Sequence, residues 1–140
     1  MSETVHATCI AIGGRGVLLG GRSGSGKSDL ALRLIDRGAR LVSDDYTDMH
    51  LVDGRLVARA PASIAGRMEI RGVGLVEVEA AMEAPVCLFA DLDSPPERLP
   101  EAATRRIAGR DVPTIALAAL EPSAPLKLER ALLLFGLPLP

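Results

Sequence analysis

The chain has 140 residues, a formal net charge of −2, and acidic and basic residues interspersed along its length. This pattern excludes an electrostatic case for binding nucleic acid or an anionic membrane. The length predicts one domain spanning residues 1–140. Because hydrophobic residues make up 48% of the chain and aromatic residues only 2%, we expect an aliphatic core.

The sequence also predicts a cytoplasmic protein without a membrane anchor. No apolar run reaches the roughly 18 residues of a transmembrane helix. The N-terminus carries Glu3 and His6 where a secretory signal would have basic and then apolar residues. Cys9 and Cys87 lie far apart, each within an apolar run. This spacing favours two buried free thiols over a disulfide or a metal site.

In chain order, the first predicted elements are two strands. Thr4–Ile12 is apolar and rich in β-forming residues, interrupted by His6, and Gly16–Gly20 begins the next strand. The glycine-rich turn between them, Gly13–Gly16, predicts an antiparallel hairpin. The second strand would therefore have an antiparallel neighbour, unlike the plain parallel order of many P-loop folds.

A phosphate-binding motif follows directly. The next eight residues read Gly-Arg-Ser-Gly-Ser-Gly-Lys-Ser, which fits the P-loop pattern G-x-x-x-x-G-K-[ST]. Val17–Leu19 before it has the pattern of a strand, and Lys27–Arg37 has the pattern of a helix. The predicted nucleotide-binding residues are Gly21, Arg22, Ser23, Gly24, Ser25, Gly26, Lys27 and Ser28.

The chemistry of phosphate binding explains this composition. Glycines allow positive φ values, so that successive backbone N–H groups point into one hollow, and the following helix adds the positive end of its dipole. Lys27 would reach the β- and γ-phosphates, and the Ser28 hydroxyl would ligate Mg²⁺. We therefore predict binding of ATP or GTP; the alternative is a glycine-rich turn that only caps a helix.

Shorter patterns predict the remaining elements. Asp53-Gly54 is a strong signal for a type I′ hairpin, and Gly38 is placed to end the first helix. The further elements are a strand at Leu41–Ser43, hairpin strands at Thr47–Val52 and Arg55–Ala60, a helical turn at Ala62–Arg67, a glycine-punctuated loop at Glu69–Gly74, a strand at Val86–Ala90, a partly helical stretch at Glu97–Arg110, a strand at Val112–Leu117, and a closing helix at Leu126–Phe135 with Ser123 as its N-cap. Together they predict an α/β fold, a P-loop NTPase-like mixed sheet with an antiparallel N-terminal hairpin and helices packed on the sheet.

Two places could supply the carboxylate that a P-loop enzyme needs near Mg²⁺. Asp91 follows the apolar strand Val86–Ala90, whereas Asp44 and Asp45 follow Leu41–Ser43. A strand joined to the P-loop strand by a short helical connection commonly lies near it. The paired acids would then lie at the edge of the P-loop and point to opposite sides. One could help to hold the metal while the other faces an acceptor hydroxyl; the alternative is a turn with two solvated acids.

His6 also has two interpretations. A lone histidine in an apolar strand is more often a packed, hydrogen-bonded side chain than a catalytic one. The sequence by itself leaves both open.

Three segments together resemble the catalytic domain of the HPr kinase/phosphorylase family. They are the P-loop GGRSGSGKS, the segment RGARLVSDDYTDM and the loop MEIRGVG. The likeness runs from about His6 to Val78, and the paired aspartates and the Glu-Ile-Arg-Gly loop make it specific. The chain looks like the short form of the family that lacks the N-terminal domain. The resemblance implies that ATP, and often pyrophosphate, phosphorylates a serine of the small phosphocarrier protein HPr, with phosphorolysis as the reverse reaction.

The resemblance also implies roles for single residues. His6 falls on the family's histidine ahead of the P-loop, and Lys27 on its P-loop lysine. Asp45 falls on the acid that acts as base in the kinase direction and as acid in the reverse one. Arg98, within Pro96–Leu99, matches an arginine that the family uses.

The implied metal ligands are Ser28 and Glu69, with Asp44 as a metal or network partner. One segment departs from the family, whose last strand is followed by a proline, glycine, arginine, asparagine segment linked to dephosphorylation. Here Leu120–Pro125 reads Leu-Glu-Pro-Ser-Ala-Pro, which leaves the phosphorylase activity open. The chain ends soon after Leu126–Phe135, so a homo-oligomer like the family's hexamer is open as well.

Two rival functions stay open at this point. One is a P-loop kinase that acts on a small molecule, for which Arg105, Arg106 and Arg110 form a candidate lid cluster, although a solvated face is the simpler interpretation. The other is a module that senses ATP without transferring phosphate.

Overall fold

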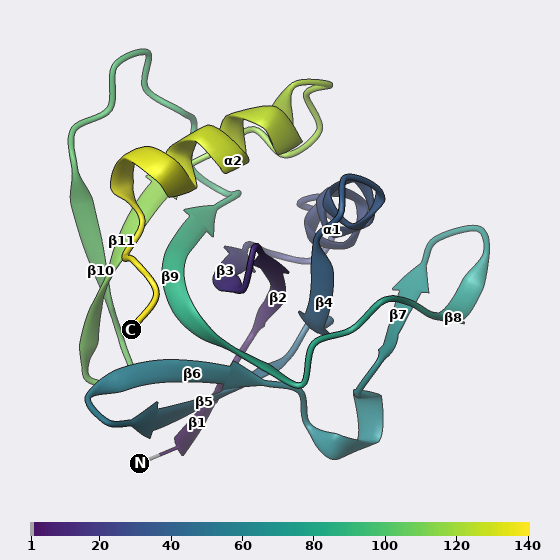
Figure 1. Cartoon of the computed structure of the whole chain (residues 1–140). Helices are drawn as coiled ribbons and strands as arrows, with labels where there is room; N and C mark the ends of the chain where they lie inside the picture. Colours follow the sequence, from purple (N-terminus) through teal and green to yellow (C-terminus); the bar gives the residue numbers. More distant parts are fainter. Residues whose placement is uncertain (1) are drawn as a thin grey trace.

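Strands dominate the structure, a computed structural model that describes residues 2–140 (Figure 1). The strands are β1 (Ser2–Val5), β2 (Ala7–Ile12), β3 (Arg15–Gly20), β4 (Arg40–Ser43), β5 (Thr47–Val52), β6 (Arg55–Arg59), β7 (Arg67–Ile70), β8 (Gly74–Glu77), β9 (Glu83–Asp91), β10 (Ala103–Ile107) and β11 (Arg110–Ala116). The helices are α1 (Lys27–Asp36), the 3₁₀ turn η1 (Ala62–Ile64) and α2 (Ala124–Phe135).

Within residues 2–140, nine strands form one curled mixed sheet. Its order is β1-β5-β6-β9-β3-β2-β4, and β11 joins β9 while β10 joins β11. The strand β2 is antiparallel to both β3 and β4, whereas β9 is parallel to β3 and to β11. The strands β11, β9, β3 and β4 therefore run in one direction, and their carboxyl ends share one edge. Ligands of open α/β sheets bind at that edge.

The two faces of the sheet bury two mainly aliphatic clusters. Both helices lie on one face, where Leu30 and Leu34 of α1 and Leu128 and Leu132 of α2 are at most 2% exposed. On the other face the curl brings β5 and β6 over the strands in the middle (Figure 1). This second cluster includes Leu18, Val42, Met49, Leu56 and Phe89. The predicted mixed sheet, its antiparallel hairpin, the helices packed on it and the aliphatic core are all confirmed.

Local signals predicted several other features correctly. Asp53 and Gly54 take φ values of 49° and 80°, as a type I′ turn requires, and they join β5 to β6. Gly38 has a positive φ of 105° just after α1. Cys9 and Cys87 are buried and free. None of the helices within residues 2–140 has the length and apolarity to cross a bilayer.

Three predicted segments are corrected by the structure. Glu97–Arg110 contains no helix; part of it is β10, which pairs antiparallel with β11. The reason is the turn Ala108-Gly109, whose φ values of 46° and 80° close a hairpin. The glycine-punctuated segment Glu69–Gly74 is the end of β7, a short turn and the start of β8. The single strand expected at Thr4–Ile12 is two strands, broken at His6.

The closing helix begins at Ala124, earlier than predicted. Ser123 holds the N-cap position, but its side chain makes no capping hydrogen bond.

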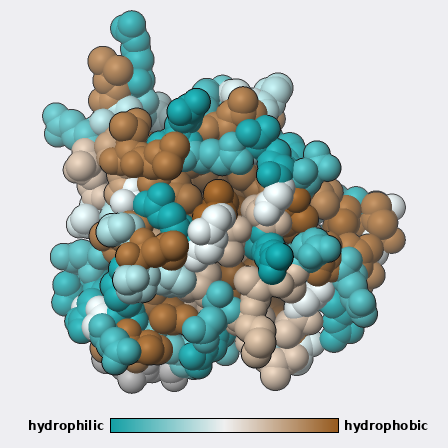
Figure 2. All heavy atoms as spheres, in the orientation of Figure 1, coloured by the Kyte–Doolittle hydropathy of each residue, from teal (hydrophilic) through white to brown (hydrophobic). Residues whose placement is uncertain are grey.

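On the surface, polar and apolar side chains are interspersed, and apolar ones gather over the projecting β7–β8 hairpin (Figure 2). Val73 and Leu75 there are 71% and 72% exposed.

Candidate active site

The P-loop links the carboxyl end of β3 to the amino end of α1. Gly26 is the N-cap residue of α1 and has a φ of 100°. A Cβ at Gly26 would lie 3.0 Å from the Leu120 side chain and 3.1 Å from that of Ala119. Both the conformation and the space therefore require glycine here. The amino end of α1 consequently faces the hollow of the loop with its free N–H groups.

Lys27 is held inside this loop. Its side chain is buried, and its ammonium group donates to the carbonyl oxygens of Gly21 at 2.6 Å and Arg22 at 3.1 Å. These acceptors are neutral, so within this loop a polyphosphate would offer the same ammonium a stronger, charge-assisted partner.

Asp44 is the centre of a buried hydrogen-bond network. Its Oδ1 accepts from the hydroxyls of Ser28 at 2.9 Å and Thr8 at 3.3 Å, and its Oδ2 accepts from the backbone N–H of Glu69 at 3.0 Å. The residue is 9% exposed. Three donors from α1, β2 and β7 satisfy the buried carboxylate, which would otherwise be costly to desolvate.

Asp45 faces the other way, toward solvent. Its Oδ1 lies 2.8 Å from Nε2 of His6, and the two side chains are 50% and 42% exposed. The His6 ring stacks on Tyr46, with centroids 5.1 Å apart. Asp45 has a φ of 68°, and its backbone N–H donates to the Thr8 hydroxyl at 3.0 Å. Thr8 therefore contacts both aspartates and sets their relative positions.

His6 is hydrogen-bonded but not packed in the core. The interpretation as a packed, hydrogen-bonded histidine therefore holds for the hydrogen bond but not for packing in the core, and a catalytic role stays a prediction.

One cleft of about 800 Å³ unites these groups. It is lined by the P-loop with the first turns of α1, by both aspartates and Tyr46, and by side chains of η1 and the β7–β8 hairpin. The same cleft is therefore lined by Lys27, Ser28, Asp45 and Glu69. Leu120 of the β11–α2 loop lies on its border.

The sequence left two sites for the acid near the P-loop, and the geometry favours one of them. Asp44 contacts the Ser28 hydroxyl, whereas Asp91 lies outside the cleft lining. Burial alone would raise the pKa of Asp91. The opposite effect is larger, because the carboxylate accepts hydrogen bonds from the Ser94 hydroxyl and from the backbone N–H groups of Asp93 and Ser94 and lies near the charge of Arg105, so the pKa is lowered. Asp91 thus acts as an anchor for its own loop.

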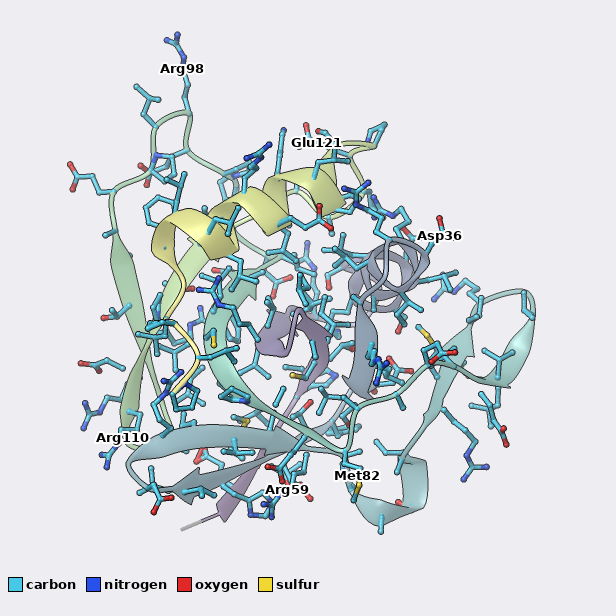
Figure 3. All side chains as sticks on the ribbon, viewed as in Figure 1. Asp36, Arg59, Met82, Arg98, Arg110 and Glu121 are labelled. Carbon is cyan, nitrogen blue, oxygen red and sulfur yellow. The ribbon has the colours of Figure 1, made fainter. Side chains whose placement is uncertain are left out.

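Arg98 is not brought to the cleft. It lies in the segment between β9 and β10, where Figure 3 shows its side chain pointing away from the sheet and from α1, and it does not line the cleft. Its role stays a prediction.

The residues near Ser28 fit a magnesium ion in their chemistry. Ser28, Asp44 and Glu69 offer hydroxyl and carboxylate oxygens, the hard ligands that Mg²⁺ prefers. Residues 2–140 contain no cluster of three or more His, Cys, Asp or Glu side chains arranged as a metal cage. Mg²⁺ in kinase sites takes one or two carboxylates plus water and phosphate oxygens, so a cage is not required.

Sequence reasoning missed Thr8 and Leu120. A threonine in an apolar strand is ordinary, but Thr8 follows His6 by two positions, and alternation along a strand places both on one side. That periodicity was the available signal for Thr8. Leu120 carried none, because its loop reaches the cleft only through the tertiary fold.

Comparison with known proteins identifies the family of the chain. The family described as HPr Serine kinase C-terminal domain matches residues 1–84. HPr kinase/phosphorylase of Clostridium beijerinckii is 45% identical over 74 residues, which is 53% of this chain and 24% of that protein. The protein of the same name from Clostridium perfringens strain SM101 is 45% identical over 76 residues, or 54% and 25%. The alignments thus span about a quarter of the curated relatives.

A solved structure extends the likeness beyond the first half of the chain. The Hpr(Ser) kinase/phosphatase from Coxiella burnetii matches with a TM-score of 0.79 and 30% identity, covering 91% of this chain and 87% of that one. The similarity of fold therefore reaches well beyond residue 84.

Proposed function

The chain belongs to the family of HPr serine kinase C-terminal domains, and from this premise we propose that it transfers the terminal phosphoryl group of ATP to a serine of the phosphocarrier protein HPr. One observation carries the proposal: Asp45, paired with His6 at 2.8 Å, opens on the same cleft as Lys27 and Ser28. The proposed proton acceptor and the phosphate-binding loop thus line the same cleft.

Asp45 is the proposed general base. His6 occupies Oδ1, which leaves Oδ2 for the acceptor hydroxyl. As the serine oxygen bonds to the γ-phosphorus, its proton passes to Asp45 and the bond to the ADP oxygen breaks. The hydrogen bond from His6 orients the carboxylate, and its partial exposure lets a protein side chain reach it. In reverse, the protonated Asp45 would return the proton to the serine oxygen.

Lys27 and the backbone N–H groups at the start of α1 would bind the phosphates and neutralise charge on the transferring group. Ser28 and Asp44, with Glu69, would hold Mg²⁺, which would supply additional positive charge at the phosphates. The second carboxylate, Asp44, is buried among three donors, which fits a holding role rather than proton transfer.

We also propose a cytoplasmic location, supported by two buried thiols that stay free. The family's Pro-Gly-Arg-Asn segment is replaced by Leu120–Pro125. We therefore propose that the kinase direction is the principal activity and that phosphorolysis is weak.

The test incubates the protein with γ-labelled ATP and purified HPr, and compares the wild type with Asp45→Asn and Lys27→Ala. Asparagine tolerates the positive φ of Asp45 and keeps its size, while it removes the charge and replaces one acceptor oxygen with an NH₂ donor. Asp45→Asn should bind ATP and transfer almost no phosphate, whereas Lys27→Ala should lose ATP binding. Transfer at the wild-type rate by Asp45→Asn would refute the role of that residue.

The labelled product separates the rival functions. Label on a serine of HPr supports the proposal, and label on a small metabolite points to a small-molecule kinase. ATP binding with no labelled product points to a sensing module. Unlabelled phosphate added to phospho-HPr, with release of pyrophosphate measured, tests the reverse reaction.

A further inference from the structure

We propose that the β11–α2 loop, residues 117–121, forms the binding site for the purine base of the nucleotide, with Leu120 as the surface on which the base stacks. The proposal rests on nucleotide binding at the P-loop, as proposed above, and adds where the base lies.

The order of the strands fixes the direction in which the nucleotide extends. The strand β3, which leads into the P-loop, lies between β2 and β9; β4 lies beyond β2, and β11 lies beyond β9. Asp44 and Asp45 follow β4 and meet the P-loop at Ser28, so the terminal phosphate belongs on that flank. The purine base must then lie on the opposite side of the P-loop, toward β9 and β11. The loop that follows β11 stands there, and Figure 1 shows α1 between it and β4.

Leu120 is an exposed apolar side chain with a fixed position. It is 69% exposed and borders the same cleft as Lys27 and Ser28. The Arg33 guanidinium of α1 donates to the carbonyl oxygens of both neighbours, Ala119 and Glu121. Two hydrogen bonds from one side chain therefore hold the backbone on either side of Leu120. An apolar side chain presented this firmly to a phosphate-binding cleft has no role in the core.

The distance to the phosphate loop is short. A Cβ at Gly26, the residue that begins α1, would lie 3.0 Å from Cδ2 of Leu120. Leu120 thus stands directly beside the end of the P-loop. The faces of a purine are apolar. Tyr46, the aromatic residue of the cleft lining, already stacks on His6 beside Asp45, so on the flank of Leu120 an aliphatic side chain is the available partner for stacking.

The test compares two anions that differ in the base. Calorimetric titration measures the dissociation constants of MgATP and of magnesium tripolyphosphate, which has the phosphates without the nucleoside. The variant is Leu120→Ser, and the matched control is Leu133→Ser, which removes an equally exposed leucine (68%) from α2. Neither substitution alters a buried side chain.

We expect Leu120→Ser to weaken MgATP binding about tenfold, near the lower end of stacking contributions to base binding, and to leave tripolyphosphate binding unchanged. Leu133→Ser should change neither. Equal losses for both anions, or no loss for either, would overturn the proposal. If the wild type binds neither anion, nucleotide binding itself is refuted, and the base site with it. Failure of the base site alone therefore gives a different result from failure of nucleotide binding.

Discussion

Replacing Thr8 with valine removes one hydroxyl that holds both Asp44 and Asp45 in place. That hydroxyl donates to Asp44 at 3.3 Å and accepts from the backbone N–H of Asp45 at 3.0 Å, and the residue is fully buried. Valine has nearly the same shape, so the core stays filled. The carboxylate of Asp44 keeps its two other donors, Ser28 and Glu69, but the N–H of Asp45 loses its partner.

The structure sets the size of both expected effects. Leaving a buried polar group unpaired costs about 1–3 kcal/mol, and the part-buried N–H of Asp45 belongs at the lower end, about 1 kcal/mol, which lowers the melting temperature by roughly 4 °C in a domain of this size. The catalytic effect is separate. Asp45 sits at a strained φ of 68°, and without its partner its carboxylate can move; a displacement of about 1 Å can cost about 100-fold in rate. We expect the transfer rate to fall about 10- to 100-fold, with the affinity for ATP unchanged.

The assay measures kcat and KM for transfer to HPr together with thermal melting, for Thr8→Val, Thr8→Ser and Thr47→Val. Serine keeps the hydroxyl and should restore the rate. Thr47 is the matched control, since it is equally buried and its hydroxyl donates to the Ala7 carbonyl at 2.7 Å without contacting either acid. Thr47→Val should therefore lose stability but not rate. If Thr8→Val and Thr47→Val have the same kcat, the positioning role of Thr8 is wrong.

Three further changes test other parts of the site. Gly26→Ala forces a side chain into a left-handed conformation and against Leu120. Thermal melting should show a loss of about 1–2 kcal/mol in stability, and titration should show that ATP binding is abolished. The control Gly54→Ala, at an open turn, should leave ATP binding intact. Asp91→Asn tests a lowered pKa: because folding favours the ionised form, its contribution is present above the ordinary carboxyl pKa and is lost as the pH falls through the folded value. The variant should therefore melt below the wild type at pH 7 and converge with it in acid, and a constant difference at every pH would contradict this. Arg98→Ala leaves the cleft intact, so ATP binding should be unchanged while KM for HPr rises; an unchanged KM would remove Arg98 from the site.

Local signals account for what the sequence predicted well. The P-loop, α1 and the Asp53-Gly54 turn each depend on neighbouring residues, so spacing alone identifies them. The strand β10 was missed because Arg105 and Arg106 look like a polar surface stretch, and only pairing with β11 makes them a strand. The contact of Asp44 with Thr8 joins positions far apart in sequence, and no local pattern encodes it.

The antiparallel strand β2 explains why this P-loop site carries a histidine. In an all-parallel sheet the amino end of each strand lies at the edge opposite the ligand. Here β2 runs against β3 and β4, so its amino end, with His6 just before it and Thr8 within it, lies at the carboxyl ends of those two strands. The pair of aspartates after β4 therefore meets a strand that begins beside it. The contact of His6 with Asp45 therefore follows from this inserted strand, and a P-loop sheet without it would have to supply a partner for the aspartate from a loop.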